Sequence, residues 1–468
     1  MLRLLKNACL LSLLLLPFLA LSQNNEGDFF VINNISLVGN NVTKPSTIYR
    51  ELLVNVGDTI FPDDDSFEKL RQSRENLLNT SLFNFVDFSW VDEDDNGKVL
   101  VVDVVERWYL WPYPYLAYAD RNISSWLEAK DISRLSLGFD LVYSNLFGLK
   151  HELGLTVIGG YNQKLAFLYD IPYLTDNQRL GLSVSSGYLR DKEMPFMTVD
   201  DKVAYFNGGR DFAQKSFFTS LKPYFRFGYR NRLFLELNYY DRSFNDSILL
   251  MNNDFASNSD IHYFSVSAVF KNDYRDDHNY PLNGHYLELE LTKIGVGIFD
   301  DEPDLFYGKL TADLYFPISG RFYWASNVTT RLSNTTSAPY FLSQGLGYRN
   351  DYVRTYDLYV VDALNFALCK NNLKYEIVKP VTKHLPFIKN ERFGKIHIAL
   401  YANVFFDFAY SWNVPLHEGV VSKMANRWLF GTGVGIDFVT YYDKVVRFEY
   451  GFNGLGESGF FIHLVAPI

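Results

Sequence analysis

The chain has 468 residues, a net charge of −10 and an aromatic content of 17%. The acidic balance argues against a nucleic-acid partner, because nucleic-acid binding relies on cationic patches. The 33 tyrosines and 40 phenylalanines are typical of outer-membrane β-barrels, in which aromatic side chains form girdles at the membrane interfaces. A secreted carbohydrate-binding β-protein, which also favours aromatics, is the alternative.

Residues 1–22 predict a cleaved signal peptide. Arg3 and Lys6 precede an apolar run at residues 8–19, and small residues follow that run. The run is too short to span a membrane as a helix. Only Cys369 would remain after cleavage, so no intramolecular disulfide is expected.

Residues 28–107 predict a small α/β domain with the element order β-α-α-β-β. Strand-like and helical periodicities alternate here, and Gly-rich turns separate them. The expected elements are a strand at 29–38, a helix capped by Ser46 that continues through Leu53, a helix that starts at 63–65, and strands at 85–91 and 99–105.

Residues 108–468 predict an antiparallel transmembrane β-barrel. Apolar and polar residues alternate repeatedly, as in the run 287–291, where Leu alternates with Glu. This pattern fits a strand between lipid and a wet lumen. The segment accommodates about 14–18 strands at roughly ten residues each plus turns and loops. No later stretch offers 18 apolar residues without charge, so transmembrane helices are not expected.

No catalytic constellation is recognisable in the sequence. It lacks the zinc-protease, Cys-x-x-Cys, phosphate-loop and nucleophile-elbow motifs, and its eight histidines are scattered. The glycine-rich run 431–435 lies within a strand pattern and favours close strand packing over phosphate binding. We therefore expect neither an enzyme nor a bound cofactor or metal.

A charged hairpin motif occupies residues 272–284. It contains Asp273, Arg275 and Asp276 and is closed by Pro281 and Gly284. Turn chemistry alone explains the proline and the glycine. The motif is therefore interpreted chiefly as a structural turn on the periplasmic side.

A second motif, with an arginine at its centre, consists of Val353, Arg354, Thr355 and Tyr356. A guanidinium keeps its proton, so inside a barrel it needs a carboxylate partner. A solvated arginine on an extracellular loop is the alternative.

Together with the α/β domain, these motifs resemble the BamA/TamA-type superfamily of outer-membrane assembly and translocation proteins. The hairpin is similar to the family's D-x-R-D…P-x-x-G motif, and residues 353–356 look like its V-R-G-[YF] loop tip. Residues 404–409, with Asp407, are similar to its F-x-D-x-G strand. Thr355 and Ala409 stand where that family has glycine.

The resemblance implies one periplasmic POTRA domain followed by a 16-stranded outer-membrane barrel. It also implies that the long loop folds into the lumen, where Arg354 pairs with Asp407 like a latch. The expected function is insertion of outer-membrane proteins or translocation of polypeptides. The expected partners are outer-membrane lipid, unfolded client polypeptides and accessory periplasmic proteins.

Pro112 and Pro114 lie two residues apart near the start of the barrel. Their missing N–H groups would weaken one edge of the first strand. The resemblance implies that this edge meets the last strand at a seam that serves as a lateral gate. Both prolines could instead belong to the linker that precedes the barrel.

Two other functions are compatible with the sequence. One is a porin-like or ligand-binding outer-membrane barrel, or a surface antigen, without assembly activity. The other is a secreted β-rich enzyme or lectin, which would also alternate apolar and polar residues but would bury its leucines.

Overall fold

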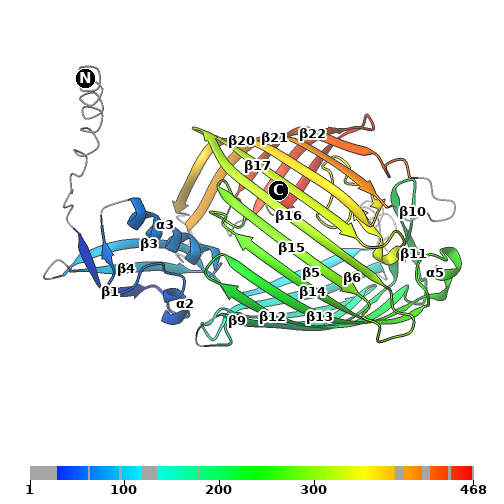
Figure 1. Ribbon diagram of the computed structural model, residues 1–468, viewed down its shortest axis with the longest axis horizontal. Coiled ribbons are helices and arrows are strands. Elements are labelled where there is room, and N and C mark those ends of the chain that lie inside the picture. Colours follow the sequence, from blue (N-terminus) through cyan, green and yellow to red (C-terminus); the bar gives the residue numbers. More distant parts are fainter. Residues whose placement is uncertain are drawn as a thin grey trace, which may run out of the picture.

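The computed structural model describes residues 29–61, 64–93, 97–118, 134–175, 177, 179–384, 395–413, 422–440 and 444–465. The predicted signal peptide at residues 1–22 lies outside them. The described part consists of a small N-terminal domain and a large sheet (Figure 1). None of the described helices is long and apolar enough to cross a membrane.

The N-terminal domain has a four-stranded sheet in the order β2-β1-β4-β3 and two helices. Strands β1 and β4 pair in parallel, whereas the other neighbours are antiparallel. The elements are β1 (Phe30–Val38), α2 (Pro45–Tyr49), β2 (Thr59–Ile60), α3 (Asp64–Asn79), β3 (Phe83–Asp92) and β4 (Gly97–Glu106). The order matches the sequence-based expectation, with β2 as an addition.

Helix α2 is shorter than the sequence predicted. It begins after Lys44, its N-cap, so Ser46 lies inside the helix. Proline at the first helical position has its φ already set for the helix and needs no N–H partner. The helix also ends before Leu53. The backbone N–H of Leu53 donates instead to Ser73 Oγ of α3 at 2.8 Å. A tertiary contact therefore replaces the expected further turn.

The core of this domain lies between its sheet and helix α3. Ile32, Leu77, Val86, Leu100 and Val102 have no exposed surface and belong to one apolar cluster. Burying such side chains contributes about 1.5–3 kcal/mol each, which is the main stabilisation available to so small a domain.

The large sheet has 16 strands, each pairing antiparallel with its neighbours. Its strands are β5 (Leu110–Tyr118), β6 (Leu135–Leu146), β7 (His151–Gly160), β8 (Gln163–Ile171), β9 (Leu180–Asp191), β12 (Gln214–Phe227), β13 (Asn231–Phe244), β14 (Asp260–Asp273), β15 (Gly284–Ile294), β16 (Leu305–Ser319), β17 (Phe322–Ser333), β20 (Asn365–His384), β21 (Lys395–Trp412), β22 (Trp428–Val439), β23 (Val445–Asn453) and β24 (Ser458–Val465). The prediction of a mainly β chain with a 16-stranded antiparallel sheet is confirmed.

Shorter elements lie in the connections. They are β10 (Glu193–Val199) with β11 (Lys202–Asn207), α5 (Asp246–Met251), the 3-10 turn η3 (Tyr340–Leu342), and β18 (Gln344–Leu346) with β19 (Val361–Asp362).

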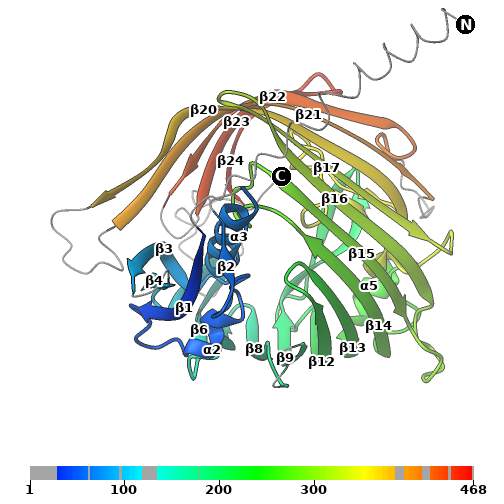
Figure 2. The same ribbon diagram turned by 60° about the vertical axis from the view of Figure 1, so that its left-hand side comes forward.

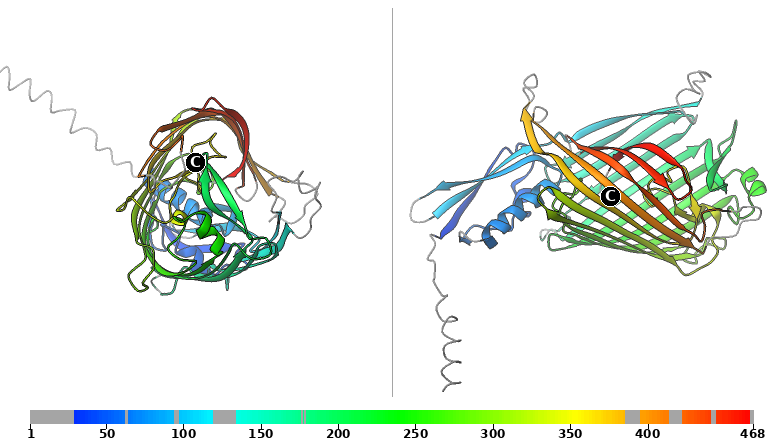
Figure 3. Two further views of the ribbon diagram at one scale, coloured as in Figure 1. Left: turned by 90° about the vertical axis from the view of Figure 1, so that its right-hand side faces the viewer. Right: turned by 90° about the horizontal axis from the view of Figure 1, so that it is seen from above.

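The sheet curves round into a barrel, and the N-terminal domain lies at one end of it (Figures 2 and 3). Strands β5 and β24 are the two ends of the strand order. Among the described residues no pairing joins these two strands. The barrel therefore has one seam, between its first and last strands.

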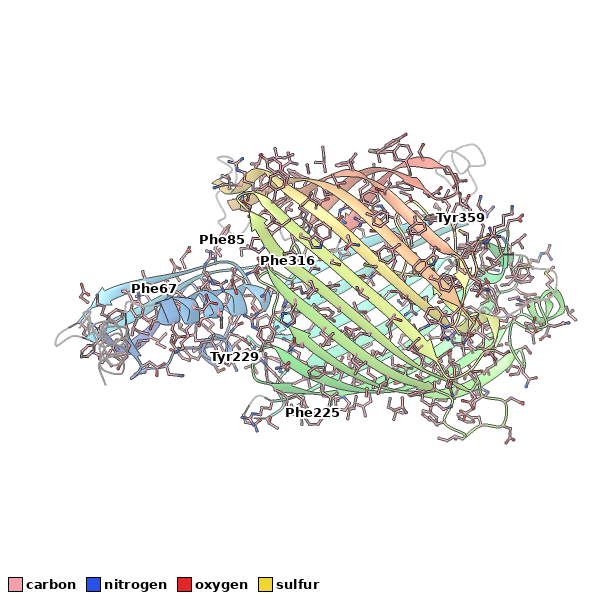
Figure 4. The ribbon with its side chains drawn as sticks, turned by 45° about the horizontal axis from the view of Figure 1, so that its top comes forward. Phe67, Phe85, Phe225, Tyr229, Phe316 and Tyr359 are labelled. Atoms are coloured by element: carbon pink, nitrogen blue, oxygen red, sulfur yellow. The ribbon has the colours of Figure 1, made fainter. Side chains whose placement is uncertain are left out.

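Side chains alternate between the two faces of the barrel as the sequence predicted. Leu289 and Leu291 of β15 are 43% and 45% exposed, whereas Thr292 of the same strand is buried. Phe225 and Phe316 are exposed as well, and Phe225 lies on the outside of the barrel at its lower edge in Figure 4. An apolar outside and a polar inside fit a barrel surrounded by lipid.

Gly284, at the start of β15, adopts φ +100°, which side chains other than glycine rarely tolerate. A Cβ atom there would lie only 2.0 Å from the carbonyl oxygen of Tyr274. This position closes the predicted hairpin motif, so the glycine is required by backbone geometry.

We expect Gly284→Ala to lower the stability of the barrel by about 1–3 kcal/mol, because the new methyl group overlaps backbone atoms. Gly456→Ala is the matched control, since Gly456 also has a positive φ, +83°, but a Cβ there would meet no atom within 4 Å. Thermal unfolding in detergent compares the two variants. Equal midpoints would contradict the steric explanation.

Candidate functional site

The long connection between β17 and β20 folds into the interior of the barrel. Val353, Tyr356 and Val361 of this connection are buried in one apolar cluster. The residues of that cluster that belong to strands of the large sheet are Phe366, Leu368, Ala409 and Leu429. The loop that carries the arginine motif is thus packed against the inner face of strands β20 to β22.

Arg354 forms a bidentate ion pair with Asp407 of β21. Its Nε donates to Asp407 Oδ2 at 2.7 Å, and its Nη2 donates to Oδ1. The backbone N–H of Arg354 also donates to Oδ2 at 3.2 Å. Arg354 is only 4% exposed and Asp407 is not exposed at all, so the solvated-arginine alternative is wrong.

Further groups surround the same guanidinium, among them the carbonyl oxygen of Asn371, which accepts from Nη2 at 3.3 Å. Arg354 Nη1 donates to Asn372 Oδ1 at 2.7 Å and to Glu449 Oε1 at 3.3 Å. The guanidinium carbon lies 4.2 Å from the centre of the Phe405 ring. The site thus supplies hydrogen-bond acceptors, negative charge and an aromatic face, which together suit a buried guanidinium.

Glycines on the neighbouring strands make room for the loop tip. A Cβ at Gly431 of β22 would lie 2.2 Å from the carbonyl oxygen of Arg354, and one at Gly451 of β23 would lie 2.5 Å from Thr355 Cγ2. Thr355 itself adopts φ +77°, a conformation that glycine reaches at less cost. The residue that departs from the family motif is therefore in the backbone conformation that a glycine there would suit.

The hairpin motif has its own internal bonds. Arg275 donates from Nε and Nη2 to both oxygens of Asp273, at 2.8 and 2.7 Å. Asp276 accepts backbone N–H groups from residues 277, 282 and 283 at 2.9–3.2 Å. Pro281 and Gly284 bound the turn that these bonds hold. The motif is a structured turn, consistent with the interpretation from sequence.

The same turn also reaches into the barrel, which the sequence did not reveal. Tyr280 is 8% exposed, and its hydroxyl donates to Asp437 Oδ2 of β22 at 2.8 Å. Arg447 of β23 binds both oxygens of Asp437 at 2.7 and 3.0 Å, and Asn403 donates to Oδ1 at 2.9 Å. The turn is thereby bound to the strands opposite it.

One carboxylate connects the two buried clusters. Glu449 Oε1 lies 3.3 Å from Arg354 Nη1 and 3.9 Å from Arg447 Nε. Glu449 and Arg447 are two apart on β23, so both face the lumen. Alternating charged residues on one strand were the available sequence signal for this network, but they do not identify partners on other strands.

The seam region also contacts the loop. His463 of β24 lies 3.6 Å from both Asp357 of the loop and Glu449. Pro112 and Pro114 lie in β5, in register with Leu141 and Phe139 of β6. Proline is tolerated in a strand where its nitrogen faces a free edge, and β5 is such an edge strand in the described sheet.

The N-terminal domain is bound to the barrel by a buried ion pair that sequence reasoning missed. Arg226 at the end of β12 donates to both oxygens of Glu51, at 3.0 and 2.7 Å. Tyr229, which lies at this junction in Figure 4, donates to the carbonyl of Leu52 at 3.1 Å. The turn of the hairpin motif joins the contact, because His278 N–H donates to Asn79 Oδ1 of α3 at 3.3 Å.

No protein-family model matches the chain, and no curated protein matches it in sequence. Among solved structures it is similar to BamA from Haemophilus ducreyi lacking POTRA domains 1–3, at 14% identity and a TM-score of 0.48, over 93% of this chain and 83% of that chain. It is also similar to CdiB from Escherichia coli, at 12% identity and a TM-score of 0.49, over 94% and 90% of the two chains. A third similar structure is CdiB from Acinetobacter baumannii, at 13% identity and a TM-score of 0.46, over 93% of this chain and 74% of that chain.

BamA gives its name to the superfamily that the motifs resemble.

We expect Arg354→Ala and Asp407→Ala each to destabilise the barrel by about 3–5 kcal/mol, because each leaves a buried charge without its partner. Arg349→Ala is the matched control, since Arg349 lies in the same loop but is exposed. Thermal unfolding in detergent provides the measurement. If both buried-site variants unfold at the wild-type temperature, the pair does not hold the loop.

We expect acid to weaken the attachment of the N-terminal domain. Burial alone would raise the pKa of Glu51, but the hydrogen bond and charge of Arg226 outweigh it and lower the pKa from 4.5 to about 2. The pair therefore contributes its full stabilisation above pH 4.5, about 3 kcal/mol, and loses it as the pH falls toward 2. Hydrogen exchange of residues 50–54 between pH 6 and 3 measures the loss. In Glu51→Gln this pH dependence should disappear.

Proposed function

We propose that this protein is an outer-membrane barrel of the BamA/TamA-type superfamily that inserts outer-membrane proteins or translocates polypeptides, without an enzymatic step. The observation that carries the proposal is the position of the loop tip 353–356, bound inside the barrel by Asp407 as the resemblance implies. The hairpin motif lies at the barrel end that carries the N-terminal domain, which supports the same interpretation.

In this proposal the N-terminal domain is a POTRA domain in the periplasm. Its sheet has two edge strands, β2 and β3, and β3 is ten residues long. An edge strand presents unpaired backbone groups that can bind an extended polypeptide as an additional strand. Unfolded clients or accessory periplasmic proteins would bind there first.

The seam between β5 and β24 then provides the route into the membrane. Both strands lie at ends of the sheet order, and Pro112 and Pro114 leave β5 with fewer hydrogen-bond donors. A client strand can pair with the β24 edge while the seam opens toward lipid. The contacts of His463 with Asp357 and Glu449 would link the opening of this edge to the position of the loop.

The interior contacts favour this function over that of an open porin. The loop tip and Tyr280 both occupy the inside of the barrel, and the N-terminal domain is bound at one end. A steady ion current through the wild-type protein in planar bilayers would instead favour the porin-like alternative.

The test is depletion of the protein followed by quantitative proteomics of the outer membrane. We expect one or more outer-membrane or exported proteins to decline, and a plasmid copy of the wild type to restore them. A copy with cysteines at Leu116 and Ile462, joined by a bifunctional crosslinker in a Cys369→Ser background, should fail to restore them because the seam is locked.

The control crosslinks Leu116 to Leu137, which are already paired in register on β5 and β6. That variant should restore the clients as well as the wild type does. Unchanged outer-membrane composition on depletion would overturn the proposed function. Full rescue by the crosslinked 116–462 variant would overturn only the proposal that the seam between β5 and β24 opens.

A further inference from the structure

A cavity of about 70 Å³ lies between the N-terminal domain and the barrel. A water molecule needs only about 10–15 Å³ measured in the same way, so the cavity can hold a larger group. The N-terminal domain contributes Glu51 and the end of α3 to its walls, and the barrel contributes the ends of strands β12 to β14 and the turn before β7.

Three of the barrel residues in this wall are cations that stand side by side. Arg226 of β12 is in register with Arg232 of β13, and Arg232 is in register with Lys271 of β14. Like charges directly opposite each other on neighbouring strands destabilise a sheet. Such a row therefore needs negative charge nearby.

The negative charge of the protein neutralises only part of this wall. Arg226 is bound by Glu51, and Lys271 lies 2.8 Å from Glu288. Within the described part of the chain, Arg232 has no carboxylate within 4 Å. The other anionic residue in the wall, Asp273, is already bound to Arg275.

Two more cations belong to this wall: Arg230, which lies 3.9 Å from Glu75, and Lys150 of the turn between β6 and β7. Lys150 is the one that matters for binding. The ammonium of Lys150, like the guanidinium of Arg232, has no carboxylate within 4 Å among the residues that the structure describes. Burial lowers the pKa of Lys150 to about 7, and the charge of Arg232 contributes to this. Lys150 also adopts φ +63°, a backbone conformation that glycine reaches with less strain. The fold thus keeps a strained residue at a position where its charged side chain lines this wall.

We propose that this cavity binds a phosphate group through Lys150 and Arg232. A guanidinium can donate two parallel hydrogen bonds to phosphate oxygens, and an ammonium adds a point charge. The phosphate can be inorganic phosphate or the headgroup of a phospholipid at the barrel rim. Because both domains form the wall, the bound anion would strengthen the attachment of the N-terminal domain to the barrel.

The test is calorimetric titration of the purified full chain, in non-ionic detergent, with inorganic phosphate at constant ionic strength. We expect saturable binding that Lys150→Gln and Arg232→Gln each weaken by about tenfold or more, the size of one lost charge-assisted hydrogen bond. Lys309→Gln is the matched control, since Lys309 is a barrel cation that is already bound to Asp351, and it should leave the affinity unchanged.

Lys150→Arg, which keeps the charge, should retain binding and shows whether a folding defect explains the loss in Lys150→Gln. Competition by a short-chain phosphatidic acid would support the site and identify lipid as the source of the phosphate. Phosphate binding without such competition would support the site with free phosphate as its ligand. No saturable binding, or equal affinity in the wild type and both glutamine variants, would overturn the proposal.

Discussion

The buried guanidinium of Arg354 is the constraint on which the interior of this protein depends. A guanidinium retains its proton even when water is removed, so the fold must surround it with negative charge and acceptors. Asp407 supplies both oxygens, and Glu449 and Asn372 bind the remaining face. These partners come from three different strands, so the position of one side chain couples the loop to β20, β21 and β23.

The coupling extends beyond the loop. Glu449 lies between Arg354 and Arg447, and Arg447 binds Asp437, which in turn accepts the hydroxyl of Tyr280. Two segments that enter the barrel from separate turns are thus joined through one set of buried charges. In such networks the loss of one member leaves its partners unsatisfied, so the cost exceeds that of a single contact.

The attachment of the N-terminal domain follows the same physical rule at the edge of the barrel. Glu51 follows the short helix α2, which ends at Tyr49, and its carboxylate lies among the cations at this end of the barrel. The row formed by Arg226, Arg232 and Lys271 is unfavourable by itself, and the domain neutralises part of it. Electrostatic complementarity therefore orients the domain, whereas the apolar core of the domain holds it folded.

The sequence alone determined the features that depend on local period and turn chemistry. Alternation such as that of residues 287–291 predicted the barrel and its two faces, and Gly284 predicted the end of the hairpin turn. The partnership of Arg354 with Asp407 could be named, but only because the motifs resemble a known family. Helix α2 was predicted too long, because the bond between Leu53 and Ser73 is not visible in a helical pattern.

Only the tertiary structure decided which distant residues meet. Tyr280 and Asp437 are 157 positions apart, and Glu51 and Arg226 are 175 apart. A strand pattern shows that a side chain faces the lumen, but not which side chain faces it from another strand. That choice depends on the register and curvature of all 16 strands and on where the N-terminal domain attaches, which are properties of the whole sheet and not of any segment.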